Sequence, residues 1–151
     1  MIHTLYREVT LATTMEACWD FLKNPQNLND ITPTDLDFRI VSPVPERMYN
    51  GLLVEYRIRI PLLGEQTWLT EIRHVCDCES FVDEQRYGPF RFWHHFHEIE
   101  ARKDGVLSRD RVHYIMPFGM VGELLHRFYV RATLERIFSY RQTRLQQLFS
   151  G

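Results

Sequence analysis

The C-terminal part of the chain has hydrophobic positions at steps of three and four, the period of one helix face. These positions are Leu124, Leu125, Phe128, Ala132, Leu134, Phe138, Leu145 and Leu148, and residues 122–149 contain no proline. The pattern predicts one long C-terminal helix. At 1.5 Å per residue it would be roughly 40 Å long, well above the average helix.

Upstream of this helix, hydrophobic positions alternate with polar ones, which is typical of strands. Seven strands are predicted, at residues 2–11, 36–41, 52–60, 66–76, 80–86, 92–102 and 106–116, with a turn at residues 61–64. After the first strand, a Thr-x-x-Glu capping box at residues 13–16 starts a short helix, which should end before Pro25. Residues 27–31 can form a second helical turn.

The arrangement of these elements predicts the fold class. Short connections between the later strands favour an antiparallel sheet. Because helices and strands are segregated along the chain, we expect an α+β fold and a single domain over residues 1–151. One sheet and one long helix must pack against each other, and a ligand would bind between them.

Composition narrows the class of protein. The chain of 151 residues has a net charge of −2 and 44% hydrophobic residues, which argues against a nucleic-acid-binding protein. Arginines are spread around the C-terminal helix, which favours a solvated outer face over a nucleic-acid or membrane surface. The odd number of cysteines (Cys18, Cys76 and Cys78) favours a reducing compartment. Without a signal-peptide pattern or a membrane-spanning run, we expect a cytoplasmic protein.

Five stretches carry a family resemblance: QTWLTEI at 66–72, FVDEQ at 81–85, GPFRFWHHFH at 88–97, DRVHYIMPFG at 110–119 and LERIFSYR at 134–141. They resemble the START-like (SRPBCC) superfamily, and within it a bacterial polyketide cyclase/dehydrase-like subgroup. The resemblance implies a helix-grip fold, in which a seven-stranded curved antiparallel sheet wraps around the C-terminal helix, with two short helices after the first strand. It also implies a cavity for a small, mainly hydrophobic molecule such as a lipid, a quinone or an aromatic polyketide. Phe90 stands where the subgroup has tyrosine.

Aromatic residues make up 13% of the chain and occur in several strands and in the helix. They can either fill the space between sheet and helix or line a cavity there, and the resemblance favours lining. The predicted ligand-binding residues are Tyr56, Trp68, Gln85, Trp93, His95, Tyr114, Phe118, Leu124 and Phe128. We expect Leu124, Phe128, Ala132 and Phe138 to form the helix wall, with residues 116–119 near the cavity mouth.

The candidate catalytic residues are Asp83, His95 and Glu71. On a strand, residues two apart share a face, so His95 and His97 point the same way. Asp83 shares a face with Phe81, and this face lines either the cavity or the solvent side. In an apolar cavity Asp83 would have a raised pKa and could form an acid/base pair with His95, with Glu71 as an alternative carboxylate.

Metal and nucleophile chemistry have weaker support. His95 and His97 could ligate zinc with Asp83, but hydrogen bonding across neighbouring strands is the expected role. In the segment 74–78, the possible metal ligands His74, Cys76 and Cys78 share a face only if the strand runs straight, and the following Glu79 suggests a turn. The chain has no nucleophile elbow and no phosphate-binding glycine loop. We therefore expect no metal and no cofactor.

Three functions fit these observations. The leading hypothesis is binding of a small hydrophobic molecule between sheet and helix. The second is a metal-independent cyclase or dehydratase that uses Asp83 or Glu71 with His95 for proton transfer. The third is a regulatory protein with a filled core that binds a protein partner.

Overall fold

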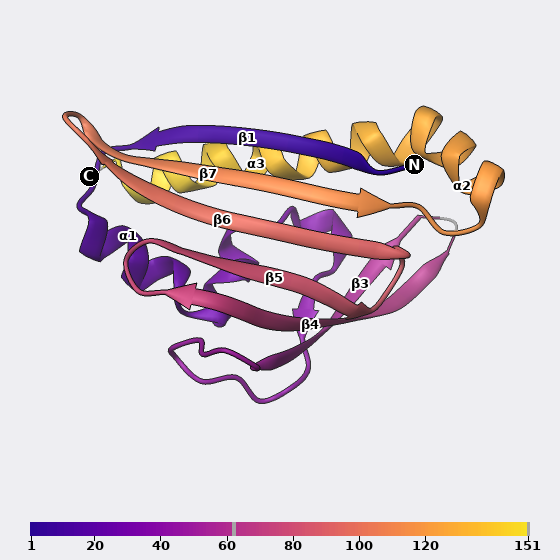
Figure 1. The fold of residues 1–151 in the computed structure, drawn as a ribbon, viewed down its shortest axis with the longest axis horizontal. Helices are drawn as coiled ribbons and strands as arrows, with labels where there is room; N and C mark the ends of the chain where they lie inside the picture. The colour runs from indigo at the N-terminus through magenta and orange to yellow at the C-terminus, as the bar shows by residue number, and fades with distance from the viewer. Residues whose placement is uncertain (62, 151) are drawn as a thin grey trace.

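Seven antiparallel strands form one curved sheet in the computed structural model, which describes residues 1–61 and 63–150 (Figure 1). The sheet order is β1-β7-β6-β5-β4-β3-β2, so strands β2 to β7 form a meander and β1 pairs with β7 at one edge. The strands are β1 (His3–Leu11), β2 (Arg39–Ile40), β3 (Leu53–Ile60), β4 (Gly64–Cys76), β5 (Ser80–Tyr87), β6 (Phe92–Arg102) and β7 (Gly105–Ile115). Residue 62, in the predicted turn, and residue 151 lie outside the described residues.

The segment between β1 and β2 is helical in three short pieces: α1 (Met15–Leu22) and the 3₁₀ helices η1 (Pro25–Ile31) and η2 (Thr34–Leu36). Thr14 caps α1, because its hydroxyl accepts a hydrogen bond from the Ala17 N–H at 3.2 Å. The cap is therefore one residue later than the predicted Thr13. Strand β2 is shorter than predicted because η2 includes Leu36 and Asp37 then adopts a left-handed backbone, with φ of 46°.

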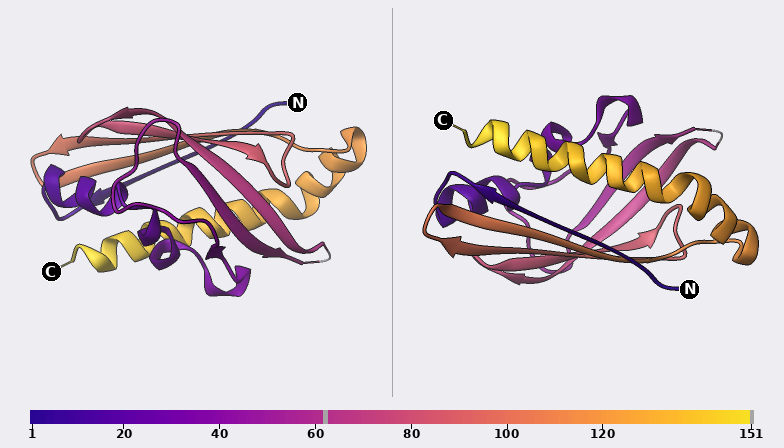
Figure 2. Two further views of the ribbon diagram at one scale, coloured as in Figure 1. Left: turned by 90° about the horizontal axis from the view of Figure 1, so that it is seen from below. Right: turned by 90° about the horizontal axis from the view of Figure 1, so that it is seen from above.

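The predicted long C-terminal helix is confirmed as one continuous element of 30 residues that crosses one face of the sheet (Figure 2). It consists of α2 (Gly119–Leu125), the π-helical segment η3 (His126–Val130) and α3 (Arg131–Leu148). At the end of η3 the Arg131 N–H bonds to the His126 carbonyl, five residues earlier, which adds a residue to that turn. Among the described residues, no helix is long and apolar enough to cross a bilayer.

The predicted helix face is correct in α3 at Leu134, Phe138 and Leu145, but it is wrong there at Ala132 and Leu148, which are exposed, and wrong in α2 and η3. Leu134 and Phe138 are buried, as the periodicity predicts, but Leu124 and Phe128 are 59% and 74% exposed. The additional residue in the π turn rotates α2 relative to α3. As a result, His126 rather than Phe128 faces the sheet.

Two hydrophobic clusters pack under the sheet, and buried polar residues lie at the border between them. Phe81 belongs to the first cluster and Phe138 to the second. The His97 ring stacks on Phe81 with centroids 4.1 Å apart, and the His95 ring lies edge-on to Phe138 at 5.3 Å. The core is therefore polar at its centre, where the sheet faces α3.

Candidate functional site

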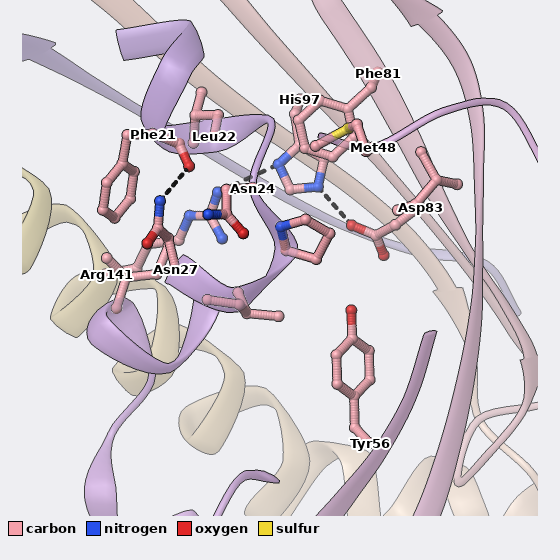
Figure 3. A pocket seen from close by; sticks show the side chains of 14 residues that line it. Phe21, Leu22, Asn24, Asn27, Met48, Tyr56, Phe81, Asp83, His97 and Arg141 are labelled. Carbon is pink, nitrogen blue, oxygen red and sulfur yellow. Dashed lines mark hydrogen bonds and ion pairs between the residues drawn. The ribbon is translucent and has the colours of Figure 1, made fainter. Parts of the chain in front are cut away.

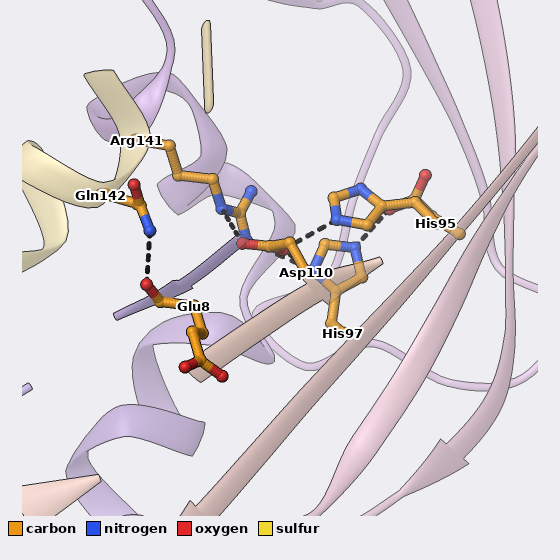
Figure 4. A network of polar contacts seen from close by, with 7 residues as sticks. Glu8, His95, His97, Asp110, Arg141 and Gln142 are labelled. Carbon is orange, nitrogen blue, oxygen red and sulfur yellow. Dashed lines mark hydrogen bonds and ion pairs between the residues drawn. The ribbon is translucent and has the colours of Figure 1, made fainter. Parts of the chain in front are cut away.

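The strand register brings ionisable side chains from three adjacent strands to the buried face of the sheet. Asp83 on β5 is paired with His95 on β6, and His97 on β6 is paired with Asp110 on β7. Arg141 reaches the same place from α3 (Figure 4). We call Asp83, His95, His97, Asp110 and Arg141 the charged cluster.

His95 lies between two carboxylates. Its Nε2 is 2.8 Å from Asp110 Oδ1 and its Nδ1 is 3.2 Å from Asp83 Oδ2. Burial opposes protonation of His95, but the charges and hydrogen bonds of Asp83 and Asp110 outweigh it and raise the His95 pKa. The raised pKa and the two flanking carboxylates favour the imidazolium form, in which both ring nitrogens donate.

His97 has the opposite role. Burial and the neighbouring positive charge of His95 lower the His97 pKa. Its Nδ1 lies 3.2 Å from Arg141 Nη2 and accepts from that group, while Nε2–H donates to Asp83. His97 is therefore neutral, and these two partners select its tautomer.

Both carboxylates are ionised. Burial would raise the Asp83 pKa, but the charge of His95 and hydrogen bonds from both histidines lower it. Burial likewise opposes ionisation of Asp110, and Arg141, whose Nε is 3.5 Å from Asp110 Oδ2, together with the histidines lowers its pKa well below the ordinary value. Two carboxylates, one imidazolium and one guanidinium give the charged cluster no net charge, which is the condition for burying it.

Two cavities adjoin the charged cluster. The larger has a volume of about 140 Å³ and lies between β3–β6 and α3. The smaller, about 60 Å³, lies beside α1 and η1 (Figure 3). Asp83, His97 and Arg141 line both cavities, so the polar groups stand at the junction of two mainly apolar spaces.

Tyr56 also lines both cavities and supplies a free hydroxyl. Figure 3 shows the hydroxyl pointing toward Asp83 and His97, and no described residue hydrogen-bonds to it. Burial and the charge of Asp83 raise the Tyr56 pKa, so the group is a neutral phenol. A phenol can donate to a ligand as well as accept from one.

The predicted ligand-binding residues divide into two groups in the structure. Tyr56, Trp68, Trp93 and His95 line the larger cavity. The others line neither cavity: Gln85, Tyr114, Phe118, Leu124 and Phe128.

Local structure explains the second group. The Gln85 side chain hydrogen-bonds both backbone groups of Phe90 and so fixes the β5–β6 connection. The Tyr114 hydroxyl bonds to His126 Nε2 at 2.7 Å. Phe118, at the helix start, is 76% exposed, so residues 116–119 do not form a mouth to either cavity.

Two expectations about the carboxylates need correction. Asp83 does face the cavity, but its pKa is lowered rather than raised because two histidines donate to it. It is therefore an anion that anchors the two histidines rather than an acid. Glu71 lies on the opposite face of β4 and pairs with Arg86 at 2.6 Å, so it does not meet His95.

Sequence reasoning missed Asp110 and Arg141, and both had a detectable signal. Asp110 is two residues before Val112, which is buried on the same face of β7. Arg141 is three residues after Phe138 and four before Leu145, on the buried face of α3. An arginine and an aspartate at core positions of two elements are a sign of a buried ion pair.

Two groups of side chains have the residue types and proximity of metal ligands. Asp83, His95 and His97 form one, and His3, Glu123 and His126 form the other, each with ligand atoms within 4.8 Å of one another. In the first group, a protonated His95 has no lone pair to offer, and Arg141 adds positive charge. In the second, the His3 and His126 rings are stacked at 3.6 Å, so a single ion cannot lie in both ring planes.

Solved structures with the same architecture are numerous. The Zhui aromatase/cyclase from Streptomyces sp. R1128 has a TM-score of 0.75 and 12% identity over 99% of this chain and 94% of that chain. Major latex-like protein 151 from Panax ginseng has a TM-score of 0.72 and 11% identity over 99% and 98%. A START superfamily protein from Mycobacterium smegmatis has a TM-score of 0.61 and 12% identity over 97% and 99%.

These identities are too low to transfer a function, and the likeness is one of fold. No family model matches the sequence, and no curated protein does either. The sheet order, the long C-terminal helix and these structural matches together establish that the chain has the helix-grip fold, which it shares with the aromatase/cyclase and the START superfamily protein.

Proposed function

We propose that the protein binds a small, mainly hydrophobic molecule in the larger cavity, with a polar group of the ligand directed at Tyr56 and the charged cluster. The observation that carries the proposal is a mainly apolar cavity of about 140 Å³ lined by the Tyr56 phenol, to which none of the described residues hydrogen-bonds. Apolar walls with a few convergent polar groups are typical of small-molecule sites. The alternative of a regulatory protein assumed a core filled by side chains, and this cavity argues against it.

The volume limits the size of the ligand. An apolar cavity of roughly 150 Å³ holds one benzene molecule. The larger cavity therefore fits about one ring, and the smaller, at about 60 Å³, has room for a small substituent but not for a second ring. A phenol or a quinone satisfies this limit, whereas a long-chain lipid needs the helix and sheet to separate.

Apolar burial sets the affinity. An aromatic ring buries roughly 150–250 Å², which at about 25 cal/mol per Å² contributes about 4–6 kcal/mol. This corresponds to a Kd between about 1 mM and 0.04 mM before any hydrogen bond is counted. Screening should therefore use millimolar ligand.

Native mass spectrometry of the purified protein, with extraction of any co-purified molecule, is the first experiment. Thermal-shift measurements with phenols, quinones and long-chain lipids then test the size limit. We expect stabilisation by one-ring compounds. A protein that is isolated empty and is not stabilised by any of these compounds would contradict the proposal.

Two variants locate the binding site. Ile137 lines the larger cavity, so Ile137→Trp should fill it and abolish the ligand-induced shift. Ser139→Trp places the same ring on the exposed side of α3 and is the matched control. Tyr56→Phe should weaken ligands that carry a hydrogen-bonding group by about 1–3 kcal/mol and leave benzene-like ligands unchanged.

A second candidate function is proton transfer in a metal-independent cyclase or dehydratase. It is favoured by His95, which lines the larger cavity and whose raised pKa favours the protonated form. His95 would donate this proton, and Asp83, ionised beside it, would hold the imidazole in place. Turnover of an aromatic polyketide precursor that persists in a His95→Gln variant would remove this assignment.

A further inference from the structure

The start of the long helix and the ends of several strands lie at the same end of the sheet. The register pairs His3 with Tyr114 and Phe92 with Ile115, so β1 and β6 begin where β7 ends. Strand β5 ends on the same side, since Tyr87 follows the residues paired with β6. Helix α2 starts directly after β7 and extends beyond the sheet at this end (Figure 1).

Large apolar side chains are exposed at this end. Met120 is 90% exposed, Phe118 76%, Phe128 74%, Tyr87 68%, Val121 65% and Leu124 59%. We call these six residues the apolar tip. Five of them lie at or near the start of the long helix, which extends beyond the sheet, and Tyr87 is the last residue of β5. Exposed apolar residues gathered in one place mark an interaction site.

The charges beside the apolar tip are positive. Among the described residues, neither Arg91 nor Arg127 has an ion-pair partner, and the Arg127 guanidinium lies 5.7 Å from the Phe128 ring centre. Glu123 is the acidic residue of α2, and His3 engages it at 2.8 Å. Exposed apolar side chains bordered by arginines without an ion-pair partner match a partner surface that carries negative charges on its outside and apolar groups beneath them.

We propose that the apolar tip docks on an anionic lipid bilayer, with Met120 and Phe118 inserted below the headgroups and Arg91 and Arg127 at the phosphates. Interfacial anchors combine these two features. A second copy of the chain would bring the same arginines together, and an acidic protein surface would leave the projecting apolar side chains without a matching recess. The inference does not rest on the proposed cavity ligand, because docking needs neither the cavity nor the charged cluster.

Flotation with lipid vesicles tests the proposal on the ligand-free protein. We expect binding to vesicles of phosphatidylcholine mixed with phosphatidylglycerol, and weaker binding to phosphatidylcholine alone. Met120→Glu should weaken binding at least about tenfold, because it replaces an inserted apolar side chain by a charge. Arg127→Glu should weaken it by more than about fivefold and make it less sensitive to salt.

Tyr49→Glu is the matched control, since Tyr49 is 56% exposed in the connection between β2 and β3, away from the apolar tip. Thermal unfolding checks that all three variants fold. The proposal is overturned if neither vesicle binds, or if Met120→Glu and Tyr49→Glu bind equally well. It is also overturned if sedimentation shows a dimer that Met120→Glu converts to monomer, since the apolar tip would then be an interface between copies.

Discussion

Replacing Arg141 by methionine should be among the most destabilising single changes in the protein. The substitution keeps a long side chain but removes the guanidinium that faces Asp110 Oδ2 at 3.5 Å and His97 Nδ1 at 3.2 Å. The charged cluster would then hold two carboxylates and one imidazolium, a net charge of −1 in a buried place. Methionine cannot donate to either partner.

The expected loss follows from burial. Removing one partner of a buried ion pair costs about 3–5 kcal/mol, because the remaining charge stays buried without compensation. For a domain of 151 residues each kcal/mol lowers Tm by about 2–4 °C, so Tm should fall by about 6–20 °C. Urea unfolding near neutral pH gives the same quantity as a free energy. In acid the loss should shrink once the pH falls below the lowered His97 pKa, because His97 can then take up a proton and restore neutrality.

The same helix supplies a matched control. Arg136 forms a two-bond ion pair with Asp35 at 3.0 and 3.1 Å, but this pair is exposed. Arg136→Met should cost about 0–1 kcal/mol. The double variant Arg141→Met/Asp110→Asn returns the charged cluster to zero net charge, so it should be more stable than the sum of the two single losses predicts, by at least about 1 kcal/mol. Additive losses, or equal losses for Arg141→Met and Arg136→Met, would refute the electrostatic reasoning.

Three further predictions concern single sites. Because the His95 pKa is raised in the folded protein, its protonation stabilises the fold fully below pH ~6.5, and this stabilisation is lost as the pH rises through the folded-state pKa. His95→Gln should therefore lower the free energy of unfolding more in acid than in alkali, which urea unfolding at a series of pH values measures. A cost that grows with pH would contradict this sign. Gly122→Ala should destabilise by about 1–3 kcal/mol in thermal unfolding, although alanine favours helices, because its Cβ would meet the Pro117 carbonyl oxygen at 1.7 Å. A gain in stability would show that the backbone at the helix start moves enough to accommodate the added Cβ. Burial raises the Cys18 pKa to about 11, so a thiol reagent at neutral pH should modify the two exposed cysteines first and Cys18 only on unfolding. Rapid modification of all three cysteines in the folded protein would show that α1 opens.

Much of the fold was predictable because strand alternation and helix period are local signals. The bounds of β6 were predicted to the residue, and its inward positions Trp93, His95 and His97 follow from a period of two. The site was less predictable, because alternation tells which residues share a face but not which face is covered. Asp83 and, as its alternative, Glu71 were both candidates in the sequence, and only packing against α3 separates them.

The direction of the Asp83 pKa shift could not be derived from one strand. It depends on donors from β6, and these are held in place by Asp110 and Arg141 from two other elements. Burial alone predicts a raised value, whereas the assembled cluster reverses the sign. The π turn is a comparable case. Apolar residues at Leu124 and Phe128 follow an unbroken helical period, and nothing in that spacing signals one residue too many.

Viewed in terms of chain length, η3 holds one more residue than an α-helix needs at that place. Deleting a single residue between His126 and Val130 would leave a continuous α-helix but turn α2 by about 100° relative to α3. Gly122, which now packs against the Pro117 carbonyl, would leave the sheet side, and a bulky neighbour would take its position. The length of this short segment, rather than its composition, therefore decides which side chains of α2 the rest of the protein can touch.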